Sequence, residues 1–223
     1  MPGRYFIVAP EEGANLYPAD FDDAPIAAAY ARPRYNISPQ QTAPVLRLIE
    51  GEFIESGMRW GFAPRWMKDP RQAQINARSE TVFEKRMFQH AAKAQRCLVP
   101  VSGWYEWQPV DGGKQAWAIH MPGFAAFTLA GLWTVGNDRE GGPEENFLTL
   151  ITEPSEQLRP IHHRMPVILD ADGCRTWLDP DADRQALQAL LRPWPGELSL
   201  RAVSSYVNSI RHQGPECLEP DGS

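Results

Sequence analysis

Short runs of β-branched and aromatic residues recur along the chain, and Gly, Pro, Asp or Asn ends each of them. Such runs are typical of β-strands, and the residues between them are typical of turns. The predicted strands are Arg4–Ala9, Val45–Glu50, Phe53–Trp60, Cys97–Val101, Ala116–Met121, Phe127–Trp133, Phe147–Thr152 and Leu198–Val203. A further aromatic strand is expected around Glu106, whose carboxylate is flanked by Trp and Tyr.

Helical patterns are fewer. A capping-box pattern at Thr81 predicts a helix over Glu84–Gln95, and leucines at core spacing predict another over Asp181–Leu191. Weaker helical patterns cover Asp22–Ala31 and Ser155–Leu158. Because strands and helices do not alternate regularly, the sequence predicts an α+β fold with a mainly antiparallel sheet.

The composition is that of one folded domain. The chain has 223 residues, of which 43% are apolar and 22% charged, and both values are ordinary for a globular protein. We expect a single domain over 1–223, with 137–145 as a polar loop and 219–223 as a flexible tail. The 21 prolines favour many short elements joined by rigid loops.

The location of the protein is also predicted from sequence. The first ten residues lack the pattern of a signal peptide, and no apolar stretch approaches the roughly 18 residues that a membrane helix needs. The three cysteines, Cys97, Cys174 and Cys217, are far apart and read as free thiols in a reducing compartment. We therefore expect a cytoplasmic protein without a membrane partner.

Charge at first argues against DNA as a partner, because 22 Lys or Arg against 28 Asp or Glu give a net charge of −6. Met58–Arg96, however, has nine basic and three acidic residues, a net of +6, whereas the remainder has a net of −12. A solvated helix face accounts for part of this excess, at Lys85 and Lys93. The acidic chain is thus compatible with a local nucleic-acid site.

Four polar clusters are candidates for chemistry: the N-terminal MPGRY, INARSET with Asn76, SGWYEW with Glu106, and IHHRMP with His162 and His163. Each has a structural alternative, since Asn76 could form an Asx turn, Glu106 could point to water, and the histidines could lie on a surface loop. In the functional interpretation, apolar neighbours raise the pKa of Glu106 toward the useful range for acid–base chemistry, and one imidazole moves protons. Adjacent histidines seldom ligate one ion, so we expect no metal site.

These clusters belong to a longer ordered set of motifs: MPGRY, RYNISP, WGFAPRW, INARSET, KRMF, CLVPVSGWYEW, IHHRMPVIL and VN…GPECLEP. The set resembles the SOS-response-associated peptidase (SRAP) family of abasic-site-processing proteins over essentially the whole chain. The resemblance implies an α+β fold in which short helices surround a small closed β-barrel, no metal or organic cofactor, and single-stranded DNA with abasic sites as partner. It also implies nucleoid association when bound to DNA, and we expect a monomer.

The family caps abasic sites with a covalent link. The α-amine of a cysteine after the initiator Met forms an imine with the sugar aldehyde, and its thiol closes a thiazolidine. The resemblance implies that Asn76 holds the N-terminus, that Glu106 opens the sugar and moves protons, and that His162 supports imine chemistry and slows reversal of the link.

The resemblance also implies a DNA-binding surface of two kinds of side chain. The residues expected to meet phosphates are Arg4, Arg78, Arg86 and Arg164. Those expected to offer apolar surface to splayed bases are Pro39, Trp66, Met87 and Phe88.

One position departs from the family, because Pro2 stands where the family has its cysteine. No thiazolidine can form there. If Met1 is removed, as a small second residue permits, the secondary amine of Pro2 can still form a charged iminium that favours β-elimination of the 3′ phosphate. If Met1 is retained, its amine lies one residue too far along the chain.

Three functions therefore remain open from the sequence. The first is covalent processing of abasic sites, as a transient crosslink or a lyase. The second is a binding module for single-stranded or damaged DNA that has lost crosslinking with the cysteine. The third is peptidase action, which in this family is removal of the residues before the cysteine, and which we expect to be limited to N-terminal self-processing.

Overall fold

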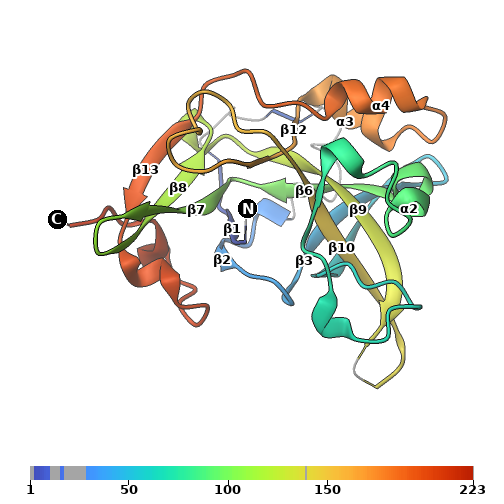
Figure 1. Cartoon of the computed structure of the whole chain (residues 1–223), viewed down its shortest axis with the longest axis horizontal. Helices are drawn as coiled ribbons and strands as arrows, with labels where there is room; N and C mark the ends of the chain where they lie inside the picture. The colour runs from blue at the N-terminus through green and yellow to red at the C-terminus, as the bar shows by residue number, and fades with distance from the viewer. Residues whose placement is uncertain (1–2, 11–15, 18–28, 139, 223) are drawn as a thin grey trace.

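The described residues form two β-sheets that lie side by side, with β1 near the middle of the molecule (Figure 1). The computed structural model describes residues 3–10, 16–17, 29–138 and 140–222. In spatial order, the five-stranded sheet contains β13 (Ser199–Val203), β8 (Gly113–His120), β7 (Gly103–Val110), β1 (Tyr5–Ile7) and β2 (Arg34–Ile37). The eight-stranded sheet contains β3 (Thr42–Ile49), β4 (Glu52–Trp60), β5 (Asn76–Arg78), β6 (Arg96–Val101), β9 (Phe127–Asn137), β10 (Pro143–Thr152), β11 (Met165–Pro166) and β12 (Ile168–Leu169).

The eight-stranded sheet closes into a small barrel. Its ring runs β10–β4–β3–β6–β9 and returns to β10, because β9 and β10 pair along a hairpin. Only the β4–β10 pairing in this ring is parallel. Every residue of β6 is buried, as expected for a strand inside a closed sheet with both faces covered. The expected fold class, α+β with mainly antiparallel strands and a closed barrel, is confirmed.

The five-stranded sheet depends on a close approach at Gly103. The ring of Phe6 passes over this glycine, and a Cβ built on Gly103 would lie 2.3 Å from Phe6 Cζ and 2.5 Å from the carbonyl oxygen of Ile119. A side chain at this position would therefore collide with the Phe6 ring and with the backbone of β8. Glycine is required here by space, because the Phe6 ring of β1 and the backbone of β8 both approach this position closely.

Both sheets share one hydrophobic core. Tyr5, Trp104 and Ile119 of the five-stranded sheet join the same buried cluster as the barrel residues, and Tyr5 packs edge-on against Trp60 at a centroid distance of 5.1 Å. All three cysteines are buried, and burial raises the pKa of each thiol. None of the helices in the described ranges is long and apolar enough to cross a membrane.

All eight strands listed from the sequence exist, with ends shifted by a few residues. The predicted loop 137–145 is shorter than expected, because β9 and β10 extend into it as a hairpin. The sequence reading missed β2, β5, β11 and β12, which are short and irregular in pattern. The predicted helix Asp22–Ala31 lies almost wholly outside the described residues. Ser155–Leu158 forms hydrogen-bonded turns instead of a helix.

The α-helices of the described residues are α2 (Gln89–Ala94), α3 (Ala171–Leu178) and α4 (Arg184–Leu190). The helix predicted over Glu84–Gln95 is confirmed in its second half as α2, but the start predicted from the capping box at Thr81 is wrong, because 82–88 forms turns. Val82 and Phe88 are both buried, and six residues along a regular helix would place them about 120° apart.

The other two α-helices begin at aspartate caps. The second predicted helix is confirmed as α4, which begins after the N-cap Asp183. The sequence reading missed α3, whose N-cap Asp170 accepts a hydrogen bond from the N–H of Gly173 at 2.8 Å. Gly173 in the first turn of that helix hides the helical pattern.

Candidate functional site

Glu106 lies on β7 and is almost completely buried, with 2% of its surface exposed. The alternative in which it points to water is therefore wrong. Burial raises the pKa of this carboxyl group to about 7, since the charged form loses its hydration. A carboxyl group with this pKa is divided between its acidic and basic forms near neutral pH, which suits proton transfer.

His162 faces Glu106 from the loop that follows β10. Its Nε2 lies 3.8 Å from Oε2 of Glu106, and its Nδ1 contacts the backbone N–H and carbonyl oxygen of Arg164, each at 3.1 Å. Burial lowers the pKa of His162 to about 4. The imidazole is therefore neutral at pH 7, and the contact joins a neutral ring to a carboxyl group rather than two charges. His163 is exposed, and its ring centre lies 4.3 Å from that of His162.

Asn76 begins β5 and pairs in parallel register with Thr149 of β10. The hydroxyl of Thr149 donates a hydrogen bond of 2.5 Å to Oδ1 of Asn76. The amide is thus oriented by a strand neighbour, and the Asx-turn alternative is wrong. Sequence reasoning missed Thr149, although a threonine inside the apolar run FLTLIT was a visible signal.

Arg164 joins two of the motifs. Its guanidinium forms an ion pair with Glu80, which follows β5 in the INARSET segment, and its backbone contacts His162. The segment of Asn76 is therefore linked to the loop of His162, and that loop in turn contacts Glu106. Three clusters that are far apart in the sequence meet in one region. Arg164 was expected to meet phosphate, but in this structure Glu80 occupies its guanidinium.

The first strand leads into the same region. Tyr5 pairs with Trp104, Phe6 pairs with Gly103, and Tyr105 donates its N–H to the carbonyl oxygen of Arg4 at 3.0 Å. Continuing this antiparallel register brings Gly3 opposite Glu106. Pro2, the predicted nucleophile, and Met1 lie outside the described residues.

Arg4 differs from its predicted role. Its Nη1 donates to Oδ1 of Asn36 (3.1 Å) and to the carbonyl oxygen of Val207 (2.6 Å), and its Nη2 donates to the carbonyl oxygen of Asn208 (2.9 Å). The guanidinium also lies over the Trp107 ring, 5.4 Å from the ring centre. These internal contacts occupy the group that was expected to meet phosphate.

The remaining predicted DNA-binding residues divide by exposure. Arg78 and Arg86 are exposed, and Trp66 is 65% exposed on the loop after β4. Pro39 and Met87 are half-buried. Phe88 is a core residue, 5% exposed and packed edge-on against Phe62 at 5.8 Å, so the prediction that it offers surface to bases is corrected.

The loop that carries Trp66 is held from the barrel. The buried amide of Asn146 accepts a hydrogen bond of 2.8 Å from the N–H of Ala63. A Cβ at Gly136 would lie 2.1 Å from the carbonyl oxygen of Ala63, so the loop depends on this glycine for its approach to β9. Trp66 is therefore an exposed aromatic ring on a supported loop.

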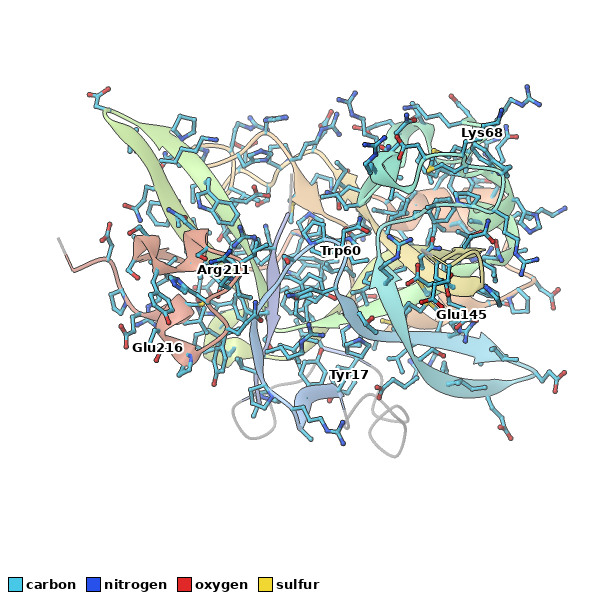
Figure 2. All side chains as sticks on the ribbon, turned by 90° about the horizontal axis from the view of Figure 1, so that it is seen from below. Tyr17, Trp60, Lys68, Glu145, Arg211 and Glu216 are labelled. Atoms are coloured by element: carbon cyan, nitrogen blue, oxygen red, sulfur yellow. The ribbon has the colours of Figure 1, made fainter. Side chains whose placement is uncertain are left out.

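Three of the nine cations in the segment 58–96 are engaged in contacts within the protein. Arg59 pairs with Glu144 at 2.5 Å, Arg71 pairs with Asp69 at 3.0 Å, and Arg96 donates to four backbone carbonyl groups. The other six cations of the segment are exposed: Arg65, Lys68, Arg78, Lys85, Arg86 and Lys93. Lys68 and Arg211 lie on opposite halves of the molecule along its longest axis (Figure 2).

The fold and the site together define a class: a small closed-barrel protein in which a buried carboxyl group faces an imidazole beside the first strand. The family of SOS response associated peptidases (SRAP) matches residues 1–210, and the chain belongs to this family. Among the residues that the structure describes, no three His, Cys, Asp or Glu side chains are grouped as a metal site requires.

Relatives with known names agree with this membership. The abasic site processing protein YoqW of Bacillus subtilis (strain 168) is 37% identical over 194 residues, which covers 84% of this chain and 86% of the relative. The abasic site processing protein HMCES of Gallus gallus is 35% identical over 224 residues, covering 85% of this chain and 66% of the relative.

Solved structures share the fold. A protein from Bacteroides thetaiotaomicron has a TM-score of 0.74 at 23% identity and covers 83% of this chain and 84% of its own. A protein from Bordetella bronchiseptica has a TM-score of 0.70 at 23% identity and covers 91% of this chain and 99% of its own.

Proposed function

We propose that this protein binds abasic sites in single-stranded DNA and reacts with them through the amine of Pro2, once Met1 is removed. The observation that carries the proposal is the pair of buried Glu106 and half-buried His162 at the point toward which the first strand leads. The abasic-site relatives support the substrate class. The product is a transient imine or iminium link, or the strand break that follows from it.

The amine of Pro2 is connected to the first strand through Gly3. Gly3 continues the register toward Glu106, and one peptide bond joins Pro2 to Gly3, which sets their Cα atoms about 3.8 Å apart. The proposal therefore takes the amine of residue 2 to react beside this carboxyl group. An α-amine with a pKa near 8 is neutral in roughly a tenth of molecules at pH 7, which is enough for nucleophilic attack.

The covalent link is proposed to form through a carbinolamine. The amine nitrogen attacks C1′ of the ring-opened sugar aldehyde and forms a carbinolamine. Glu106, in its protonated form, donates a proton to the carbinolamine oxygen, the C–O bond breaks, and water leaves. The nitrogen of Pro2 is secondary, so the resulting iminium keeps its positive charge.

In strand cleavage, Glu106 acts as a base instead of an acid. The Glu106 carboxylate produced by the first step accepts a proton from C2′ of the sugar. The electron pair of that C–H bond forms the C1′–C2′ double bond of an enamine, and the iminium π pair returns to nitrogen. The nitrogen pair then re-forms the iminium, a C2′–C3′ double bond forms, the C3′–O bond breaks, and the 3′ phosphate leaves. His162, neutral at pH 7, is the second group able to accept a proton here.

The DNA surface is proposed to combine exposed cations with one aromatic ring. Arg78 and Arg86 would contact phosphates, and Trp66 would stack on a base. A strand on this surface would pass near the loop of His162, because Glu80 ties the segment after β5 to Arg164.

A second candidate is a binding module without covalent chemistry, and the replacement of the family cysteine by Pro2 favours it. Borohydride reduction separates the two, since it converts an imine or iminium into a stable amine. We expect the protein without Met1 to give a trapped adduct of protein plus abasic single strand in an intact-mass measurement.

Two matched proteins serve as controls for trapping. A form with its N-terminal amine acetylated should bind the DNA equally and give no adduct. Pro2→Cys should form a link that survives without borohydride. If the protein without Met1 binds abasic DNA but gives no trapped adduct, the non-covalent module is the correct function.

A further inference from the structure

The motif VN…GPECLEP is the only quoted motif without a role so far, and it lies against the start of the first strand. Its Val207 and Asn208 belong to the short 3-10 helix η5 (Ser205–Asn208). The guanidinium of Arg4 donates to the carbonyl oxygens of both residues, at 2.6 Å and 2.9 Å. Charge-assisted hydrogen bonds of this kind are about twice as strong as neutral ones.

Asn36 of β2 completes the contact from the other side. Its side chain is fully buried, accepts from Arg4, and donates from Nδ2 to the carbonyl oxygens of Val207, Ser209 and His212 at 3.2, 3.0 and 2.9 Å. The C-terminal segment is therefore held by Arg4, directly before β1, and by Asn36 of β2. Chain ends usually fray unless tied down, and here the start of the chain is tied to a segment about 200 residues later.

Asn208 extends this contact to β7. Its Oδ1 accepts a hydrogen bond of 2.7 Å from Nε1 of Trp107, the residue directly after Glu106. The backbone carbonyl of the same Asn208 accepts from Arg4. One residue thus touches both the strand that leads to the N-terminus and the strand that carries the buried carboxyl group.

We propose that Asn208 and Arg4 form a latch that holds the first residues against β7 and thereby positions the N-terminal amine for reaction beside Glu106. Asn208 and Arg4 act here as positioning residues. The consequence for chemistry rests on the proposed function, whereas the latch itself rests on the contacts above. A misplacement of about 1 Å can cost roughly a hundredfold in rate, so a reactive group at a chain end needs such support.

The test compares Asn208→Ala, which removes the acceptor for Trp107, with Asn208→Asp, which keeps an acceptor oxygen. Ile210→Ala is the matched control, because this side chain is 57% exposed in the same segment. Arg4→Lys is a second variant, since one ammonium nitrogen cannot take the positions of both Nη1 and Nη2.

Three quantities are measured for each variant. The first is hydrogen exchange at the amide of Tyr105, which donates to the carbonyl of Arg4 and so reports whether the first strand is docked. The second is the single-turnover rate of borohydride trapping at saturating abasic DNA. The third is the Kd for that DNA without borohydride.

We expect Asn208→Ala and Arg4→Lys to speed exchange at Tyr105 and to lower the trapping rate about tenfold to a hundredfold, with Kd unchanged. Asn208→Asp should restore both quantities, and Ile210→Ala should change neither. Unchanged exchange at Tyr105 in Asn208→Ala would overturn the latch, and faster exchange with an unchanged trapping rate would overturn its role in positioning. If the wild type gives no adduct while Asn208→Ala still speeds exchange, the proposed chemistry fails and the latch stands.

Discussion

The two sheets use their charged side chains in opposite ways. The five-stranded sheet buries Glu106 and directs the guanidinium of Arg4 to its own C-terminal segment. The barrel side leaves exposed six cations of the segment 58–96 besides the ion-paired Arg71, and it carries Trp66 on a supported loop. The first region thus has the environment of a reactive centre, and the second has the surface of a strand-binding site.

This difference supports the proposal that strand binding and chemistry are carried by separate regions of the fold. The two regions are joined through one loop, where His162 contacts Glu106 and Arg164 pairs with Glu80. A change in the five-stranded sheet should therefore alter reaction rates with little effect on affinity. A change on the barrel surface should do the reverse.

The largest effect is expected for Glu106→Gln, which keeps the shape and removes the titrating group. Loss of a general acid–base typically costs about 10²–10⁴-fold, so the trapping rate should fall by that factor while the Kd for abasic DNA stays the same. The wild-type rate should peak between pH 7 and 8, because it needs Glu106 protonated (pKa about 7) and an amine neutral (pKa near 8).

The pH profile of the variant sharpens this test. Without the carboxyl group, the decline of the rate above pH 8 should disappear, and the rate should level off once the amine is neutral. If Glu106→Gln lowers affinity as much as rate, the two regions are not separable in the way that the structure indicates.

The next effect concerns stability. The pKa of Glu106 is raised from 4.5 to about 7 in the folded state, so the fold favours its protonated form and loses stability as the pH rises between these values. A shift of this size corresponds to about 3 kcal/mol. The free energy of unfolding of Glu106→Gln, relative to the wild type, should therefore increase by about 3 kcal/mol from pH 4.5 to pH 7, as measured by urea denaturation.

His162 provides the opposite sign for the same measurement. Its pKa is lowered from 6.5 to about 4, so its contribution to stability is present above pH 6.5 and is lost as the pH falls toward 4. Relative to the wild type, His162→Gln should gain stability on acidification through this window. A difference that stays flat in either variant would contradict the burial on which the reactive centre depends.

A third prediction addresses the barrel surface. Trp66→Ala should weaken binding of abasic single-stranded DNA by about 1–3 kcal/mol, since this is the usual value for stacking of one base on an aromatic ring. Val110→Ala is the matched control, because Val110 is 47% exposed on the five-stranded sheet. Fluorescence titration should show a changed Kd only for the barrel variant, with equal trapping rates at saturation.

Much of the fold was predictable because strands leave a local signal. All eight listed strands were found, since their β-branched and aromatic runs coincide with buried segments. The helix start predicted from the capping box at Thr81 is wrong, and it shows the limit of such patterns, because a capping box describes only local hydrogen bonds. Burial of Val82 and Phe88 against the core determines that segment instead, and this is a property of the whole fold.

The site was predictable in its members but not in their contacts. Glu106 and His162 were named from the sequence, yet their separation of 3.8 Å depends on β7 and a loop that follows β10 more than 50 residues later. Arg4 shows the reverse case. Its charge suggested a phosphate contact, but its acceptors at Val207 and Asn208 come from the opposite end of the chain, and no local pattern reveals that pairing.

The smallest effect is expected when a single surface cation is removed. This change directly tests whether the barrel surface differs from the five-stranded sheet in binding DNA. Arg78 on the barrel side and Lys114 on the five-stranded sheet are both exposed cations, so Arg78→Ala and Lys114→Ala remove the same charge from the two regions. A phosphate contact on single-stranded DNA contributes about 0.7 to the slope of log K against log salt concentration. Arg78→Ala should lower this slope by about that amount, and Lys114→Ala should leave it unchanged. Equal changes in both variants would mean that affinity follows net charge alone, and the barrel surface would then have no special part in binding.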